Sequence, residues 1–157
     1  MINLSELPFY NASLTAGILS WICAQIIKTL AYLIVHRKFN KERILGAGGM
    51  PSSHSALVTA LAISISRNSG YASAEFAIAF VFALVVMYDA MGVRRAAGLH
   101  AKELNRIRKV FDEQRDLEDE PSESDEKELK EFIGHTPLEV LAGALLGILI
   151  AMMIPIN

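Results

Sequence analysis

The charged residues of this 157-residue chain are gathered in two segments, and this segregation limits what the chain can fold into. The segments cover residues 37–43 and 94–131, and the long stretches outside them are almost free of charge. A soluble helical domain of this size carries charge along the outward face of every surface helix. This chain does not, and 52% of its residues are hydrophobic. The pattern therefore predicts an all-α fold, a polytopic transmembrane helical bundle.

Four stretches of the chain are candidates for membrane-spanning helices, which need about 20 mostly apolar residues. They cover about residues 11–35, 53–67, 72–93 and 137–156. The second stretch is short, and a predicted turn at Asn68-Ser69-Gly70 links it to the third. We expect one membrane domain over residues 1–157, with residues 94–133 inserted between the third and fourth spans as a cytoplasmic helix and an acidic linker.

The distribution of Lys and Arg predicts the orientation of these spans. The two loops that follow the first and third spans hold 13 of the 15 basic residues. Only Arg67 lies on the opposite side, and Lys28 lies inside the first span. Because basic loops stay in the cytoplasm, both of these loops are expected there and both termini outside. In a bacterium this corresponds to an integral protein of the plasma membrane.

The inserted segment begins with a predicted amphipathic helix. Its polar side is basic, and its other side carries apolar residues: Ala97, Ala101, Leu104, Ile107, Val110 and Phe111. Such a helix can lie on anionic lipid or pack on the bundle. Residues 116–126 are acidic and contain Pro and Ser, which is typical of a solvated linker. Topology accounts for the basic residues, so no nucleic-acid partner is predicted.

The first polar feature that needs an explanation is Lys28, with Gln25 on the same helix face. A lysine inside a membrane helix is costly and usually has a function. Its long side chain can also reach the membrane interface, so both explanations stay open.

The second polar feature precedes the second span and reads Gly48-Gly49-Met50-Pro51-Ser52-Ser53-His54-Ser55. Pro51 suits a helix start, and Ser52 or Ser53 can cap it. A capped helix N-terminus with exposed amides is also an anion site. An ordinary helix start accounts for Pro and Ser but not for the paired glycines or for His54, which can donate a proton near neutral pH.

The third polar feature, Asp89-Ala-Met-Gly-Val-Arg94-Arg95, ends the third span. Two arginines at a membrane boundary can be a topology signal alone. They can also bind phosphate through their guanidinium groups, with Asp89 orienting one of them.

The fourth polar feature, Gly134-His135-Thr136-Pro137-Leu138-Glu139, begins the fourth span. Thr136 and Glu139 fit a capping box with Pro137 at the first helical position. This motif does not require His135. Because His135 and Glu139 are four residues apart, they can meet, and a carboxylate that fixes the tautomer supports a reactive imidazole.

All four features lie at the predicted cytoplasmic side of the membrane. Together they supply two imidazoles, cations and helix N-termini, which are the groups that phosphoryl transfer through histidine requires. No cluster of carboxylates suggests a required divalent metal, so neither a metal nor another cofactor is expected.

Three of these motifs together resemble a known group of enzymes. Gly-Gly-Met-Pro-Ser-Ser-His-Ser-Ala, Asp-Ala-Met-Gly-Val-Arg-Arg and Gly-His-Thr-Pro-Leu-Glu-Val are similar to the divergent branch of the type 2 phosphatidic acid phosphatases. That superfamily also contains vanadium haloperoxidases and bacterial acid phosphatases. Its pattern is K-x6-R-P, then P-S-G-H, then S-R-x5-H-x3-D. The resemblance covers the chain from Gln25 to Gly147.

The resemblance implies a role for each matching residue. His135 would be the nucleophile, Glu139 its orienting carboxylate and His54 the general acid. Ser for Gly in the second motif and Glu for Asp in the third are departures. No Arg-Pro follows Lys28, so Arg37 or Arg43 would replace the first-motif arginine, and Arg94 or Arg95 the third-motif one. The expected phosphate-binding residues are Lys28, Ser52, Ser53, Arg94, Arg95 and Arg43.

The sequence therefore predicts a membrane phosphatase that hydrolyses a phosphomonoester or diphosphate, expected to be a phosphorylated lipid, through a phosphohistidine intermediate. The alternative is a non-catalytic membrane protein that keeps the phosphate pocket as a lipid-phosphate binder or scaffold. A carrier for an anionic solute fits less well, because carriers usually bind near the midplane. Gly143 and Gly147 allow close helix packing within one chain or between two, which leaves a homodimer open.

Overall fold

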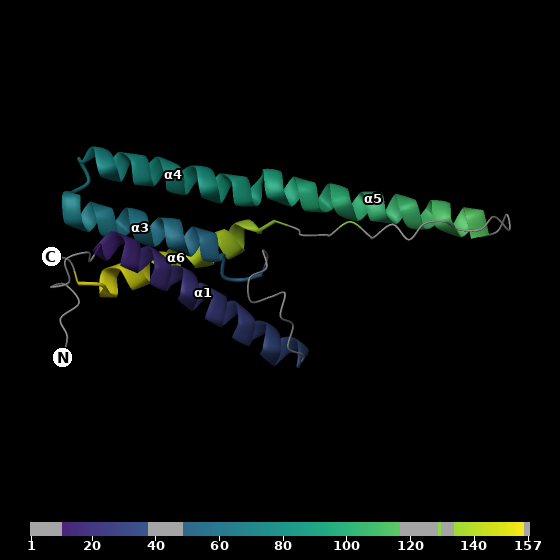
Figure 1. Cartoon of the computed structure of the whole chain (residues 1–157), viewed down its shortest axis with the longest axis horizontal. Helices are drawn as coiled ribbons and strands as arrows, with labels where there is room; N and C mark the ends of the chain where they lie inside the picture. The colour runs from purple at the N-terminus through teal and green to yellow at the C-terminus, as the bar shows by residue number, and fades with distance from the viewer. Residues whose placement is uncertain (1–10, 38–48, 117–128, 130–133, 156–157) are drawn as a thin grey trace.

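A computed structural model describes residues 11–37, 49–116, 129 and 134–155 (Figure 1). The helices in this part of the chain are α1 (Ala12–His36), α3 (Ser53–Ser69), α4 (Ala74–Met91), α5 (Val93–Asp116) and α6 (Pro137–Met153). No strand occurs among the described residues. The predicted all-α fold is therefore confirmed.

Side-chain caps explain where most of these helices begin. Asn11, Ser52, Ser73 and Thr136 each accept a hydrogen bond from the backbone amide three residues on, in the first turn of α1, α3, α4 and α6. Such a cap satisfies one of the amides that a helix start leaves without a partner. The observed starts at Ser53 and Pro137 coincide with the predicted ones, because both caps are local signals.

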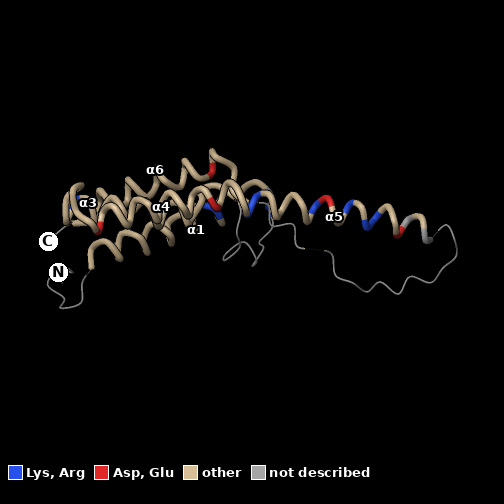
Figure 2. Tube along the Cα trace, turned by 90° about the horizontal axis from the view of Figure 1, so that it is seen from above, with Lys and Arg blue, Asp and Glu red and all other residues tan. Residues whose placement is uncertain are grey.

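Helix α3 lies at the centre of the bundle, in contact with α1, α4 and α6. Figure 1 shows α4 running along α3, with α1 and α6 on the other side of α3. Helix α5 begins directly after Gly92 and continues the line of α4 beyond the end of the bundle. Figure 2 shows its blue and red charged positions, whereas the bundle helices are mostly tan.

The interior of the bundle is built from small side chains. The buried residues of α3 are alanines, serines and one valine, and α4 turns only Ala79, Ala83 and Ala90 inward. Many large apolar side chains of α1, α4 and α6 are exposed. Small residues inside and large ones outside are typical of helices that pack closely within lipid, whereas water-soluble proteins do not expose apolar surface on this scale.

Two glycines of α6 show how close this packing is. A Cβ atom at Gly147 would lie 2.5 Å from the Ala56 carbonyl oxygen, and one at Gly143 would overlap the Ser52 carbonyl. Both glycines therefore let α6 press against the backbone of α3. Of the two predicted uses of this glycine pair, packing within one chain is the one observed.

Length and apolarity single out two helical stretches as able to cross a membrane, Ala12–Val35 and Ala74–Asp112. Helix α6 is apolar but has only 17 residues, and α3 is equally short and less apolar. A 17-residue helix is about 25 Å long, slightly less than the hydrocarbon core of a bilayer. The count of four spans stays a prediction.

Candidate functional site

The start of α6 joins His135 to Glu139. Nδ1 of His135 lies 3.0 Å from Oε2 of Glu139, and the same oxygen accepts the Thr136 amide at 3.0 Å. The Thr136 hydroxyl accepts the Glu139 amide at 3.3 Å, which completes the predicted capping box. One carboxylate thus caps the helix and holds the imidazole, whose side chain is only 6% exposed.

Gly134 brings this helix start against the junction of α4 and α5. The His135 amide donates to the Ala90 carbonyl at 3.0 Å. A Cβ atom at Gly134 would lie 2.7 Å from that carbonyl oxygen and 2.8 Å from the carbonyl carbon of Arg94. Only glycine fits there, so the chain before His135 meets Arg94 and Arg95, some 40 residues upstream.

The start of α3 is joined to the same place through its backbone. The Ser52 amide donates to the Glu139 carbonyl at 3.0 Å. The Ser52 hydroxyl accepts the Ser55 hydroxyl at 2.9 Å and caps α3 through the Ser55 amide. Ser52, Ser53 and Ser55 are all buried. The Ser52 groups expected to bind phosphate therefore have partners inside the fold.

His54 lies on the first turn of α3 and is exposed. The cations of Arg94 and Lys28 and the ring of His135 all act electrostatically on its imidazole. Residues from α1, α3, α5 and the start of α6 therefore converge at one end of the bundle. Sequence analysis predicted that these groups share one side of the membrane, and the fold brings them within electrostatic range.

Lys28 is 4% exposed and lies against the glycine loop before α3. A Cβ atom at Gly49 would lie 3.4 Å from Cγ of Lys28, and the φ angle of Gly49 is +85°, where glycine is favoured. The lysine is therefore enclosed by protein, as a functional lysine in a membrane helix would be.

The two arginines differ in their surroundings. Nε of Arg94 lies 2.5 Å from Oδ2 of Asp89, and both side chains are partly exposed. Asp89 is therefore paired with Arg94, the contact that an orienting role would require. Arg95 is half-buried beside Gly134. Arg43 lies outside the described residues, as does most of the acidic linker, and Arg37 ends α1 in a left-handed conformation.

Three contacts of Ser55 and Arg67 were not predicted from the sequence. Ser55 joins Ser52 in a buried hydroxyl pair. Arg67 donates to the carbonyls of Ala151 and Ile154, the latter at 3.0 Å, and so caps the C-terminal end of α6. The only available signal was that Ser55 and Arg67 are polar residues in a membrane bundle, where such residues mark positions that require a partner.

A further long-range contact ties the linker to α5. The Asn105 side chain donates to the Leu129 carbonyl at 2.8 Å and accepts the Leu129 amide at 3.0 Å. Within the described residues, no three His, Cys, Asp or Glu side chains are placed to hold a metal ion.

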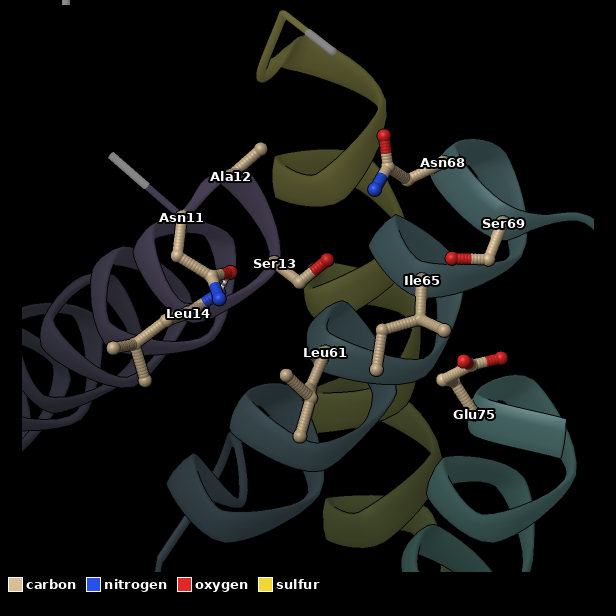
Figure 3. Close-up of a pocket in the computed structure, with 9 residues that line it drawn as sticks. All are labelled: Asn11, Ala12, Ser13, Leu14, Leu61, Ile65, Asn68, Ser69 and Glu75. Atoms are coloured by element: carbon tan, nitrogen blue, oxygen red, sulfur yellow. Dashed lines mark hydrogen bonds between the residues drawn. The ribbon is translucent and has the colours of Figure 1, made fainter. Parts of the chain in front are cut away.

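A pocket of about 500 Å³ lies at the opposite end of the bundle (Figure 3). The starts of α1 and α4 and the second half of α3 line it. Its polar side chains are those of Asn11, Ser13, Asn68, Ser69 and Glu75. The histidines line no part of it. The chemistry predicted from sequence belongs to the other end, because the imidazoles and the buried lysine are there.

Comparison with known proteins agrees with this architecture. The model of the divergent PAP2 family matches residues 9–150. A protein of Bacillus subtilis (strain 168), the uncharacterized membrane protein YuiD, is 38% identical over 148 residues, covering 92% of this chain and 94% of the relative. No solved structure matches the chain significantly. With the family pattern running through almost its whole length, the chain belongs to the divergent PAP2 family and is a membrane protein.

Proposed function

We propose that this protein is a membrane phosphatase that hydrolyses a phosphomonoester or diphosphate at the cytoplasmic face. The expected substrate is a phosphorylated lipid. The observation that carries the proposal is the 3.0 Å pair of His135 and Glu139 beside His54 and two cations. Family membership makes phosphatase activity an expectation for this chain.

The nucleophile in this proposal is Nε2 of His135. With Nδ1 protonated and donating to Glu139, the lone pair of the imidazole is on Nε2. Nε2 attacks phosphorus and forms a P–N bond while the P–O bond to the leaving group breaks. Protonated His54 gives its proton to the leaving oxygen. Lys28, Arg94 and Arg95 supply the positive charge that the phosphoryl oxygens need.

The second half of the reaction regenerates the enzyme. His54, now neutral, removes a proton from a water molecule as that water attacks phosphorus. The P–N bond breaks, inorganic phosphate leaves, and both imidazoles return to their starting protonation states. The cations are protein side chains, so the proposed reaction requires no metal ion or organic cofactor.

The second candidate is a membrane protein that binds a lipid phosphate or another anion without turning it over. One observation favours it: the Ser52 amide and hydroxyl have partners inside the fold, and His135 is buried. A phosphate in such a site would have fewer donors than a phosphatase normally supplies.

Purified protein in detergent or nanodiscs separates the two candidates. With a chelator present, the phosphatase should release phosphate from phosphatidic acid or a lipid diphosphate and accumulate an acid-labile phosphohistidine. His135→Ala should lose both signals, whereas His100→Gln, which changes an exposed histidine of α5, should keep them. Saturable vanadate binding with no turnover across such substrates would favour the binding protein. Full activity in His135→Ala would remove that residue as the nucleophile.

A further inference from the structure

Helix α5 carries an apolar stripe that the proposed function does not use. Its positions follow a spacing of four, three, four, three and four residues: Val93, Ala97, His100, Leu104, Ile107 and Phe111. We call these six residues the α5 seam. At this spacing they fall on one helix face. All six side chains are exposed, and the four largest apolar ones are between 50% and 67% exposed.

Another face of α5 is already occupied. The reciprocal Asn105–Leu129 hydrogen bonds hold Leu129 against it, and Asn105 and Gly98 are buried. Successive residues of an α-helix are about 100° apart around its axis. Asn105 therefore points about 100° away from Leu104, in the direction opposite to Ile107. Leu129 therefore contacts a different face of α5 from the seam.

The direction of α5 decides which surfaces the seam can reach. Figures 1 and 2 both show α5 continuing the line of α4 away from the bundle. Its 24 residues correspond to about 36 Å of helix. The stretch that is able to cross the membrane, Ala74–Asp112, contains both helices, but only α4 is apolar along its length. An α4 that spans the bilayer therefore directs α5 out of it. Neither lying flat on lipid nor packing on the bundle fits this direction.

We propose that the α5 seam binds the α5 seam of a second copy of this chain, forming a parallel coiled coil on the cytoplasmic side. Two copies inserted in one membrane have the same orientation, so their α5 helices run parallel. A two-fold axis along the membrane normal puts the helices in register. The spacing of the seam is the heptad repeat that such a pair requires.

The charges beside the seam complement each other in this arrangement. Glu103 directly precedes Leu104 and Arg108 directly follows Ile107, so the two residues flank the seam on opposite edges. In a parallel coiled coil, Glu103 of one helix faces Arg108 of the other, five residues further along. Each dimer would therefore gain two Glu103–Arg108 pairs. Within one chain, Glu103 lies 3.9 Å from Arg106 and Arg108 lies 3.8 Å from Asp112, and both ion pairs are within one helix.

His100 is the one polar residue of the seam. A polar residue at such a position weakens a coiled coil and restricts its register. Replacing it should therefore strengthen association, a direction that loss of folding cannot mimic. The proposal is independent of catalysis, since it can be tested without any measurement of phosphatase activity.

Cysteine crosslinking of the full chain in nanodiscs tests the geometry, in a Cys23→Ser background that removes the natural cysteine. In a parallel, in-register pair, Leu104→Cys and Phe111→Cys should each form a disulfide with the same residue of the second copy. Lys102→Cys and Lys109→Cys, which lie on the far side of the helix, should not. Equal crosslinking at all four positions, or none at Leu104→Cys, would overturn the proposal.

Dissociation measured by dilution in detergent tests the energetics. Leu104→Lys should raise the dimer dissociation constant about tenfold or more, because two lysines would meet in the seam. His100→Leu should lower the dimer dissociation constant.

The charges beside the seam are tested by exchanging them. Glu103→Arg and Arg108→Glu should each weaken the dimer, and the two changes together should restore it. Unchanged dissociation in Leu104→Lys would reject the seam. A bimane label on Leu104→Cys quenched by brominated anionic lipid would reject it in favour of a membrane surface.

Discussion

Oε2 of Glu139 lies 3.0 Å from both Nδ1 of His135 and the backbone nitrogen of Thr136. The Glu139 carboxylate therefore has two functions: it caps α6 and it holds the His135 imidazole. The amide of Thr136 holds the carboxylate in place whether or not a phosphate is bound. This leaves Nε2 of His135 as the nitrogen available for chemistry, and it links the stability of α6 to the arrangement of the proposed site.

The double role of Glu139 can be separated by substitution. Glu139→Gln keeps an oxygen for the Thr136 amide but removes the negative charge beside His135. We expect thermal stability to change little and kcat to fall by about 10⁴-fold, the size of effect seen when an orienting carboxylate is neutralised. Steady-state kinetics and thermal unfolding of the purified variant check both parts.

Thr136→Ala is the matched control for Glu139→Gln. It removes the hydroxyl that accepts the Glu139 amide and leaves the His135–Glu139 pair intact. We expect a loss of stability of about 1 kcal/mol, typical of a removed N-cap, with most activity kept. If Thr136→Ala lost activity as strongly as Glu139→Gln, capping and not charge would explain the effect.

Gly134 controls whether the start of α6 can reach the α4–α5 junction. Gly134→Ala would place a methyl group within 3 Å of the Ala90 carbonyl oxygen and the Arg94 backbone. We expect vanadate affinity to fall, because His135 would be displaced from Arg94 and Arg95. Isothermal titration with vanadate measures this, and unchanged affinity would show that the site does not depend on the junction.

Helix packing in the bundle predicts opposite outcomes for two glycine substitutions. Gly147→Ala should destabilise the protein by about 1–3 kcal/mol, because the new Cβ would lie 2.5 Å from a carbonyl oxygen of α3. Gly17→Ala should be neutral or stabilising, since its Cβ would make an ordinary 3.5 Å contact and alanine favours helix. Thermal unfolding in one detergent compares the two, and similar losses would contradict the close α3–α6 packing.

Arg67 offers a test of the end of the bundle remote from the histidines. Arg67→Ala removes the donors to the Ala151 and Ile154 carbonyls. Hydrogen bonds to a charged group contribute about 1.5–3 kcal/mol, so the unfolding temperature should fall while phosphate binding is kept. Arg106→Ala, which breaks only an exposed 3.9 Å ion pair with Glu103, should change stability by less than about 0.5 kcal/mol.

The predicted topology has its own measurement. A periplasmic-type alkaline phosphatase fused after Asn157 should be active, because both termini are expected outside. A thiol reagent that cannot cross membranes should label Lys102→Cys, which is exposed and lies on the far side of α5 from the seam, in a Cys23→Ser background only after the membrane is opened. Labelling of intact cells would place α5 outside and reverse the orientation.

Features that depend on residues three or four positions apart could be predicted from the sequence. The Thr136–Glu139 capping box, the His135–Glu139 pair and the Ser52 cap all follow from helix geometry at fixed spacing. The segregation of charge determined the class of fold, because lipid excludes charge from spanning helices whatever their packing. Both kinds of feature are predictable from sequence because neither depends on which helices become neighbours.

Contacts between residues distant in the sequence depend on the tertiary packing of the helices. The Ser52 amide pairs with the Glu139 carbonyl, Gly134 docks against Arg94, and Arg67 caps the end of α6, each across 40 residues or more. Glycine, alanine and serine allow close approach of helix backbones but do not specify which helices approach. That choice depends on how all the helices pack together, and it is what brings the histidines, the lysine and the arginines to one end of the bundle.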